Sequence, residues 1–513
     1  MTQRHQTGFL ERLQNPRLFD HPVTGFELIE THISWVLLTG PFAYKIKKPV
    51  NLGFVDFSTL QKRHHFCLEE LRLNRRLAPM LYLAVVPLCG SPQHPAIGGP
   101  GRPFEYAVKM LQFDTGDRLD RLLERGLLQP SHIDQLAATV AQFHAQAAVS
   151  DPVSRRGRPE EIHQPVMENF TTLLQLPVVP EETSIIRRLE EWSEQRFREL
   201  SEALRARKQV GHIRECHGDM HLENMVLLDG KVVIFDCIEF NPSLYWIDTM
   251  SELAFVVMDL ERRGHPGLAS RFLNRELELS GDYPGLQVLD YYLCYRAMVR
   301  AKVAGIRLSQ ESSPTGRGEL RAYLQLAERF TSGRRPRLFI THGFSGSGKS
   351  FLTLQLLEQM GAIRIRSDME RKRLLGKSSP TPDSIYSPQR RQQVYRHLLE
   401  LADSILGYGY PVVVDATFLK REQRAMFHAL ARQRGVPFAI LDFQAPPELL
   451  RRRIVRRQAE GVDPSEATLE VLEKQLSGAV PLTREESGRT IAIDATRSEI
   501  PRSKMDEIMR STT

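Results

Sequence analysis

The sequence predicts two domains of different class, an α+β domain over residues 1–310 and an α/β domain with a parallel sheet over residues 336–513. Before residue 310, short strand-like runs come first and long helical runs follow. After Pro336, strands and helices alternate one by one. Such alternation is typical of a parallel sheet covered by helices. At 513 residues the chain is also too long for one hydrophobic core, which favours a division into domains.

The elements of the first domain follow from apolar periodicity and turn residues. We expect two strands at 28–38 and 42–48, joined by a turn at 39–41, and further strands at 82–88, 105–111 and within 215–240. Helices are expected at 59–77, 131–149 and 184–208, and through most of 244–306. This order of elements predicts a mixed sheet-and-helix domain.

The second domain begins after a linker. Residues 311–335 are expected to form this linker, which includes one bridging helix at 319–330. The strands of the second domain are expected at 337–342, 362–366, 411–415 and 438–443, with helices between them. No internal repeat relates the two domains.

Composition excludes several classes of protein. A hydrophobic fraction of 41% with 26% charged residues excludes wholesale disorder. No run approaches the roughly 20 apolar residues of a membrane span, and residues 1–13 lack the apolar run of a signal peptide. Five scattered cysteines without CxxC spacing argue against disulfides or a zinc site. We therefore expect a cytoplasmic protein without a membrane partner.

The net charge of +7 is unevenly distributed. The first 335 residues hold 41 basic and 41 acidic side chains, and the remainder holds 28 and 21. A basic C-terminal domain is compatible with a phosphate-bearing substrate or with nucleic acid. Solvated basic helix faces produce the same count, so charge alone does not decide between them.

Residues 343–350 match the pattern GxxxxGK[ST] in full, between an apolar strand and a helix. In this phosphate loop, backbone N–H groups surround phosphate oxygens and the helix N-terminus adds partial positive charge. Lys349 is expected to bridge the β- and γ-phosphates of ATP, and Ser350 to bind Mg²⁺. The expected nucleotide contacts are Gly343, Ser345, Gly346, Ser347, Gly348, Lys349 and Ser350.

Four further side chains complete this candidate site. Asp368 follows the second strand and can accept the proton of an attacking hydroxyl, or it caps the next helix. Asp415 ends an apolar strand and can orient Mg²⁺, or it belongs to a plain turn. Arg453 and Arg457 share one helix face and can close over the phosphates as a lid, unless that face is merely solvated.

The segments IRSDMERKRL and VVVDATFLKREQR and the stretch RRRIVRR…SEAT…Gln475 resemble small P-loop kinases of the polynucleotide-kinase, zeta-toxin and gluconate-kinase types. The resemblance extends over residues 336–500. It implies transfer of the γ-phosphate to a hydroxyl beneath a lid that carries arginines. These families share this framework across sugars, nucleotides and RNA ends, so the resemblance names no substrate.

A second constellation lies in the first domain. In the run CHGDMHLEN, Asp219 and Asn224 stand five residues apart, and a strand then ends at Asp236. This is the interval of the protein-kinase catalytic loop. Phosphoryl transfer there requires one carboxylate to accept the hydroxyl proton, and an amide with a second carboxylate to hold Mg²⁺.

HGDMHLEN…VVIFD resembles the aminoglycoside-phosphotransferase and choline-kinase group, which has a protein-kinase-like fold. The resemblance implies that Asp219 is the catalytic base and that Asn224 and Asp236 bind Mg²⁺. It places the ATP-phosphate lysine on the strand at 42–48, where Lys45 is favoured and Lys47 remains an alternative. Glu69 is favoured over Glu70 as its partner.

Two departures from the protein-kinase pattern stand out. The first hairpin lacks a GxGxxG loop, and Asp236-Cys-Ile-Glu239 replaces the DFG triplet. Glu239 is expected to add a metal contact or to form a salt bridge.

The leading hypothesis is an ATP- and Mg²⁺-dependent kinase with two sites, each acting on a hydroxyl of a small molecule. One alternative is a kinase for nucleic-acid 5′-hydroxyl ends, with the N-terminal domain as partner. A second is a regulatory ATP-binding protein with one catalytic site. The whole chain also resembles uncharacterised bacterial fusions of these two domain types, and no feature of the sequence predicts its oligomeric state.

Overall fold

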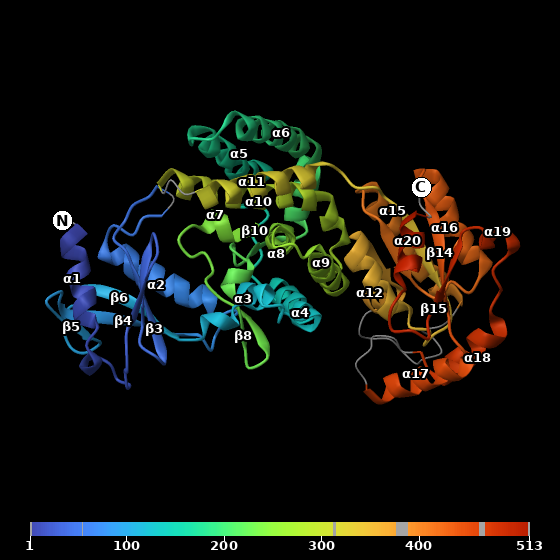
Figure 1. Ribbon diagram of the computed structural model, residues 1–513, viewed down its shortest axis with the longest axis horizontal. Helices are drawn as coiled ribbons and strands as arrows, with labels where there is room; N and C mark the ends of the chain where they lie inside the picture. Colours follow the sequence, from blue (N-terminus) through green and yellow to red (C-terminus); the bar gives the residue numbers. More distant parts are fainter. Residues whose placement is uncertain (1–2, 54, 311–313, 376–387, 461–466, 511–513) are drawn as a thin grey trace. The chain divides into compact units, whose positions relative to one another are not determined.

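The computed structural model describes residues 3–53, 55–310, 314–375, 388–460 and 467–510 (Figure 1). Its contacts divide the chain into two compact units, one of Met1–Pro165 with Leu204–Asp259 and one of Val166–Ala203 with Leu260–Thr513. The expected domain limits at residues 310 and 336 stay a prediction, and residues 311–313 of the expected linker lie outside the described residues.

A six-stranded antiparallel sheet opens the first unit, in the order β1-β2-β3-β6-β4-β5. The single strand expected at 28–38 is in fact two, because a tight turn closed by the Thr31 N–H on the Ser34 carbonyl divides it. The strands are β1 (Glu27–Glu30), β2 (Ser34–Leu38), β3 (Phe42–Lys47), β4 (Tyr82–Ser91), β5 (His94–Ile97) and β6 (Glu105–Leu111).

The two faces of this sheet have different partners. Trp35, Tyr44 and Ile46 belong to an apolar cluster with helix α1 (Gln3–Leu13). The opposite face packs on α2 (Leu60–Asn74), whose N-cap Thr59 accepts a hydrogen bond from the Lys62 N–H. Because side chains alternate along a strand, Lys45 and Lys47 of β3 point toward the α2 face.

The rest of the first unit carries the catalytic-loop sequence. The hairpin of β8 (Met225–Leu228) and β9 (Lys231–Ile234) follows Asn224 and ends just before Asp236. A second antiparallel pair joins β7 (Ile213–Glu215) to β10 (Trp246–Asp248). The helices are α3 (Leu119–Glu124), α4 (Pro130–Gln146), α7 (Pro242–Tyr245) and α8 (Thr249–Arg262), with 3₁₀ turns at Pro16–Leu18, Thr115–Asp117 and Leu222–Asn224.

The second unit combines long helices with a parallel sheet. Its helical part contains α9 (Pro266–Ser280), a 3₁₀ turn at Tyr283–Gly285, α10 (Leu286–Gln310) and α11 (Pro314–Thr331). Helices α5 (Pro159–Gln175) and α6 (Pro180–Gln209) each contribute to both units. Within the described ranges, no helix combines the length and apolar composition that a membrane crossing requires.

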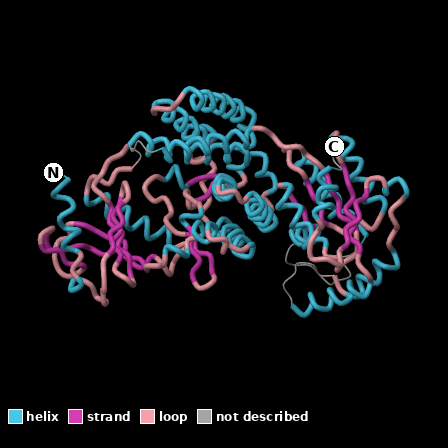
Figure 2. Tube along the Cα trace, in the orientation of Figure 1, coloured by secondary structure: helices cyan, strands magenta, loops and turns pink. Residues whose placement is uncertain are grey.

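The five parallel strands have the order β12-β13-β11-β14-β15, and helices cover both faces of the sheet (Figures 1 and 2). Four of the strands lie where the sequence predicts them, and β15 is additional. Their bounds are β11 (Leu338–His342), β12 (Ile363–Arg366), β13 (Val412–Asp415), β14 (Phe438–Gln444) and β15 (Thr490–Asp494). Both predicted fold classes are confirmed.

The helices of this α/β part follow the expected alternation. They are α12 (Lys349–Met360), α13 (Ser367–Leu375), α15 (Pro388–Gly407), α16 (Arg421–Arg434), α17 (Pro447–Glu460), α18 (Leu469–Gly478), α19 (Arg484–Ser487) and α20 (Arg502–Arg510). One core cluster joins Leu356 of α12 and Ile508 of α20 to Phe339 and Leu441 of the central strands. The carboxyl ends of these strands lead into the phosphate loop and to Asp368 and Asp415.

Two candidate active sites

In the first unit, both lysines of β3 bind one glutamate of α2. Lys45 Nζ lies 2.8 Å from Glu70 Oε1, and Lys47 Nζ lies 2.6 Å from Glu70 Oε2. The expected pairing with Glu69 is wrong, since Glu69 binds Arg72 at 2.8 Å and is part-exposed. Helical periodicity explains the correction: Glu70 shares the buried face of α2 with Cys67, three residues before it, whereas Glu69 lies about 100° away.

The two lysines have different surroundings. Lys47 is 1% exposed and pairs with Glu239 as well as Glu70, so Glu239 forms the salt bridge that was one of its two expected roles. Lys45 instead lies 2.6 Å from Asp236, the expected metal ligand. This position favours Lys45 as the phosphate-binding lysine.

The charges of this cluster support one another. Burial works to lower the pKa of Lys45, but Asp236 and Glu70 outweigh it and raise that pKa well above its usual value. Burial likewise works to raise the pKa of Glu70, and the two lysines lower it to about 2. Lys45 and Glu70 are therefore both ionised at neutral pH, whereas burial raises the pKa of Glu239.

The catalytic-loop residues also meet. The Asn224 amide donates to the backbone carbonyl and the Oδ2 atom of Asp219, at 2.9 and 3.0 Å. The Phe235 N–H donates to the Asn224 carbonyl at 2.9 Å, which brings Asp236 beside Asn224. Asp236 has a left-handed φ of 63°, a strained conformation found often at functional sites.

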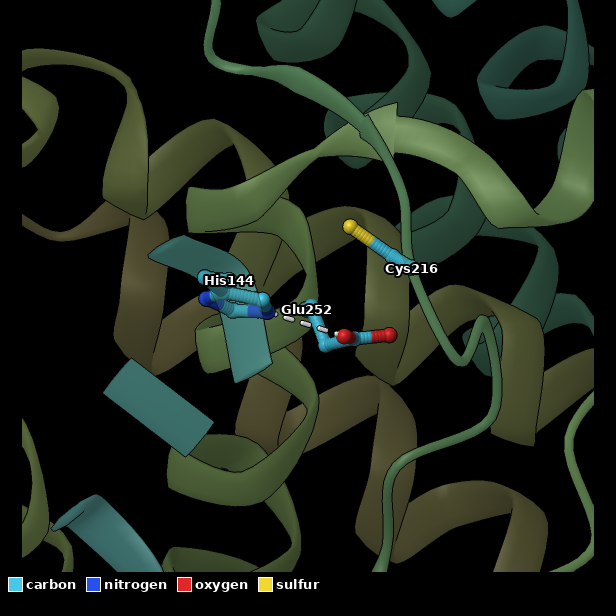
Figure 3. A group of neighbouring side chains, drawn as sticks. All are labelled: His144, Cys216 and Glu252. Atoms are coloured by element: carbon cyan, nitrogen blue, oxygen red, sulfur yellow. Dashed lines mark hydrogen bonds and ion pairs between the residues drawn. The ribbon is translucent and has the colours of Figure 1, made fainter. Parts of the chain in front are cut away.

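A buried glutamate, Glu252, binds the backbone of the catalytic loop. Glu252 Oε1 accepts hydrogen bonds from the His217 and Gly218 N–H groups at 2.8 and 2.7 Å, and Oε2 bonds His144 at 2.9 Å. Figure 3 shows the His144 imidazole facing the Glu252 carboxylate, with the Cys216 thiol nearby. These three side chains are close enough for a metal site, but both oxygens of Glu252 already serve the loop and His144.

Sequence reasoning assigned no role to Glu252. Gly218 has φ +90°, and a Cβ there would stand 2.6 Å from the Leu244 carbonyl oxygen. Glycine is thus required at the point where Glu252 binds the loop backbone. Nothing local in the sequence around residue 252 indicates that partner.

The second site is the phosphate loop between β11 and α12. Gly346 has φ +82°, and a Cβ there would lie 2.9 Å from the Leu450 carbonyl oxygen, so the backbone needs glycine. Lys349 Nζ donates to the Gly343 and Phe344 carbonyls at 2.9 and 2.8 Å, and Ser347 Oγ lies 3.3 Å away. Burial lowers the pKa of Lys349 to about 8, although Asp415 and Asp368 act in the opposite direction.

A cavity of about 840 Å³ opens in front of this loop. It gathers nine of the sequence-predicted residues, namely Ser345, Gly346, Gly348, Lys349, Ser350, Asp368, Asp415, Arg453 and Arg457. Gly343 and Ser347 do not line it but lie beneath Lys349. The residues of this prediction therefore converge on one space.

The acidic residues of the cavity differ in their pairing. Asp368 in the first turn of α13 lies 2.9 Å from Arg371. Asp415 is 4% exposed, and its Oδ2 has no hydrogen-bond partner among the described residues, with Arg366 Nε 3.9 Å away. A buried carboxylate oxygen without a partner beside a phosphate loop fits a Mg²⁺ ion or its water.

Two arginines and a glutamine border the loop. Arg453 Nη1 lies 3.4 Å from the Gly346 carbonyl and Nη2 donates to the Ala495 carbonyl at 2.8 Å, while Arg457 donates to the Ala467 carbonyl at 2.9 Å. The Gln475 amide binds the Ser345 N–H and hydroxyl at 2.9 and 3.0 Å. Gln475 belongs to a stretch that carries the P-loop-kinase resemblance, but the sequence predicted no role for it, because a helical glutamine is ordinary without its tertiary partner.

Comparison with known proteins agrees with this geometry. A model of the phosphotransferase enzyme family matches residues 67–289, and a model of the AAA domain matches residues 338–482. Uncharacterized proteins of Mycobacterium tuberculosis and Mycobacterium bovis are 31% identical over 462 residues, which covers 88% of this chain and 90% of each relative.

Solved structures similar to parts of the chain include kinases and a phosphotransferase. A gluconokinase from Sinorhizobium meliloti is 24% identical, with 35% of this chain and 90% of that chain covered and a TM-score of 0.25. A choline/ethanolamine kinase family protein from Mesorhizobium loti is 11% identical, with 63% and 95% covered and a TM-score of 0.40. Aminoglycoside 2′-phosphotransferase-IIIa is 12% identical, with 64% and 99% covered and a TM-score of 0.38.

Kinases of both matched types use ATP and Mg²⁺. The residues fit these cofactors, since each site supplies a lysine for phosphate and a carboxylate for the metal. The chain is a kinase that joins a phosphotransferase-family region to a P-loop kinase-like region, and it belongs to the family of the mycobacterial proteins.

Proposed function

We propose that the chain is a cytoplasmic phosphotransferase with two ATP·Mg²⁺ sites, each of which transfers the γ-phosphoryl group to a hydroxyl of a small molecule. The observation that carries this proposal is that both sites retain every group the reaction needs. Asp219, Asn224 and Asp236 meet in one site, and Lys349 and Asp415 meet in the other. A site kept only for regulation commonly loses one member of such a set.

In the first site, Asp219 is the base that takes the hydroxyl proton. Its Oδ2 accepts from the Asn224 amide, which orients the carboxylate, and Lys45 is placed for the ATP phosphates. Bound Mg²⁺ would neutralise phosphate charge between Asn224 and Asp236.

The cysteines support the cytoplasmic location of this proposal. All five are buried and free, as expected in a reducing compartment.

In the second site, Asp368 is the base and Arg453 and Arg457 approach the phosphates. Eight cationic and three acidic side chains line the cavity. Lys349, Arg453 and Arg457 account for the triphosphate, and the lining also contains Arg366, Arg371, Arg391, Lys420 and Lys474. This excess supports an acceptor that carries its own negative charge, such as a carboxylate or a phosphate.

ATP consumption by wild type, Asp219→Ala and Lys349→Ala tests the proposal. Each protein is assayed with neutral sugars, sugar acids, nucleosides, aminoglycosides and RNA 5′-hydroxyl ends. Two kinases in one chain predict that each substitution abolishes transfer to a different acceptor. Turnover that depends on Lys349 alone would assign the first site a regulatory role, and transfer confined to RNA ends would replace the small-molecule acceptor of the second site.

A further inference from the structure

Helix α9 closes the open edge of the parallel sheet. Strand β12 is an edge strand, and the Asn274 side chain of α9 occupies the position of a further strand. Its amide donates to the Ala362 carbonyl at 2.9 Å, and its Oδ1 accepts from the Arg364 N–H at 2.7 Å. Asn274 is 2% exposed, so these backbone groups have no access to water as a substitute. An edge protected in this way cannot pair with another chain.

One turn further along α9, Glu278 binds the same strand through its side chain. Arg364 donates from Nε and Nη2 to Glu278 Oε1, at 2.9 and 2.6 Å. The remaining nitrogen of Arg364, Nη1, donates to the Ser350 carbonyl at 2.7 Å and to Thr353 Oγ1 at 3.1 Å. Ser350 is the last residue of the phosphate-loop motif and the expected Mg²⁺ ligand. A continuous set of hydrogen bonds therefore leads from α9 to the first turn of α12.

This connection is buried and charged. Glu278 is 1% exposed and Arg364 is 4% exposed. Burial works to raise the pKa of Glu278, but the charges of Arg364 and Arg366 outweigh it and lower that pKa. Arg364 uses its three nitrogens in a fixed plane, so the position of Glu278 determines where Nη1 can meet Ser350. Without that carboxylate, the guanidinium would be a buried charge free to turn.

Helix α9 lies inside the phosphotransferase-family match, whereas Ser350 and Arg364 lie inside the AAA-domain match. We propose that Glu278 of α9 is a positioning residue of the P-loop site, which acts through Arg364 to hold Ser350 in the geometry that binds ATP·Mg²⁺. The phosphotransferase-family region thus completes the second site. This inference rests on the proposed function in one respect, that the P-loop site binds ATP·Mg²⁺.

Calorimetric titration of the full chain with a non-hydrolysable ATP analogue tests the inference, because it needs no acceptor. Each protein is titrated with and without Mg²⁺, and binding that persists in Lys349→Met belongs to the first site and is subtracted. Glu278→Gln keeps the side-chain shape and removes the charge. We expect it to weaken binding with Mg²⁺ about tenfold or more, and binding without Mg²⁺ far less, because Ser350 acts through the metal.

Arg271→Ala is the matched control. Arg271 is also on α9 and pairs with Glu358 of α12 at 2.9 Å, but Glu358 lies at the opposite end of α12 from the phosphate loop. This variant should bind within about twofold of wild type. If Glu278→Gln does not fold, Glu278→Asp replaces it: the charge remains, the reach is shorter, and an intermediate loss that is specific to Mg²⁺ is expected.

Four outcomes would refute either the positioning role of Glu278 or the proposed function of the P-loop site. Wild-type affinity in Glu278→Gln, or an equal loss with and without Mg²⁺, refutes the positioning role and leaves the proposed function intact. If Arg271→Ala loses as much affinity as Glu278→Gln, α9 only supports the fold in general, and the positioning role of Glu278 is refuted. Identical titrations of wild type and Lys349→Met would show that the P-loop site binds no ATP, and the proposed function of that site would fall first.

Discussion

The two candidate sites handle positive charge in opposite ways. In the first, Lys45 and Lys47 are paired with carboxylates, and Glu70 serves both. In the second, the hydrogen-bond partners of Lys349 among the described residues are two backbone carbonyls and a serine hydroxyl, and burial lowers its pKa to about 8. The lysines of the first site are thus already paired with carboxylates before ATP binds, which we call electrostatically complete. The lysine of the second site meets its charge partner only when the phosphates bind.

The largest expected effect of this difference concerns Glu70. Glu70→Gln leaves two buried lysines with less negative charge, and should destabilise the first unit by about 3–5 kcal/mol. Glu69→Gln is the matched control on the same helix, because it removes only a part-exposed pair with Arg72 and should cost below about 1 kcal/mol. Urea unfolding followed by tryptophan fluorescence measures both, since Trp35 and Trp246 belong to the first unit and only Trp192 belongs to the second. A larger loss in Glu69→Gln would restore Glu69 as the partner of the lysines.

The lysines themselves sharpen the comparison. Lys45→Met leaves Asp236 without its closest cation, and should destabilise the protein by about 2 kcal/mol. Lys349→Met removes a charge that burial disfavours, so stability should stay the same or rise while ATP binding at the second site is lost. Thermal unfolding without nucleotide distinguishes the two variants. Equal destabilisation by both would contradict the idea that only the first site is electrostatically complete.

A third comparison uses two arginine–glutamate pairs. Arg63 binds Glu105 at 2.8 Å in the first unit, and Arg424 binds Glu486 at 2.7 Å in the second. Burial raises the pKa of Glu105 in spite of Arg63. Burial also acts to raise the pKa of Glu486, but hydrogen bonds from Arg424 and the Thr483 N–H lower it to about 2.

These shifts have opposite consequences for stability. The contribution of Glu486 is complete above its usual pKa of 4.5 and is lost as pH falls toward 2, for a change of about 3 kcal/mol. The contribution of Glu105 is complete below pH 4.5 and is lost as pH rises. Replacement of Glu486 by glutamine should therefore lower the free energy of unfolding most at neutral pH. Replacement of Glu105 by glutamine should lower it most at acid pH. Unfolding in urea between pH 3.5 and 7 measures both slopes, and slopes of the same sign would refute the argument.

The sequence predicted the second site more fully than the first. The phosphate loop is one continuous segment whose glycines and lysine act through the local backbone, so its pattern alone locates Lys349 and Ser350. Asp368 and Asp415 followed from the ends of parallel strands, which meet at one edge of a sheet. In the first site, the choice between Glu69 and Glu70 depended on which face of α2 is buried, and the charged sequence of that helix conceals its orientation.

Tertiary contacts account for what sequence reasoning missed. Glu252 binds the catalytic loop across 34 and 35 residues of sequence, and Glu278 binds Arg364 across 86. Each is a glutamate on an ordinary helix, and only the fold supplies its partner. The single strand expected at 28–38 failed for a local reason, since a turn held by the Thr31 and Ser34 backbones interrupts an otherwise apolar run.

The smallest expected effect concerns Gln475, which holds Ser345 of the phosphate loop by two uncharged hydrogen bonds. Each such bond contributes about 1 kcal/mol, so Gln475→Leu should raise the KM for ATP at the second site roughly thirtyfold and leave the first site unchanged. Glu473→Ala on the same helix is the control, because its exposed pair with Arg451 should contribute little. Steady-state kinetics in the Asp219→Ala background isolates the second site. If Gln475→Leu changed kcat and not KM, Gln475 would act on the transferring phosphate rather than on the loop before ATP binds. The second site would then use side-chain contacts for its chemistry, as the first site does.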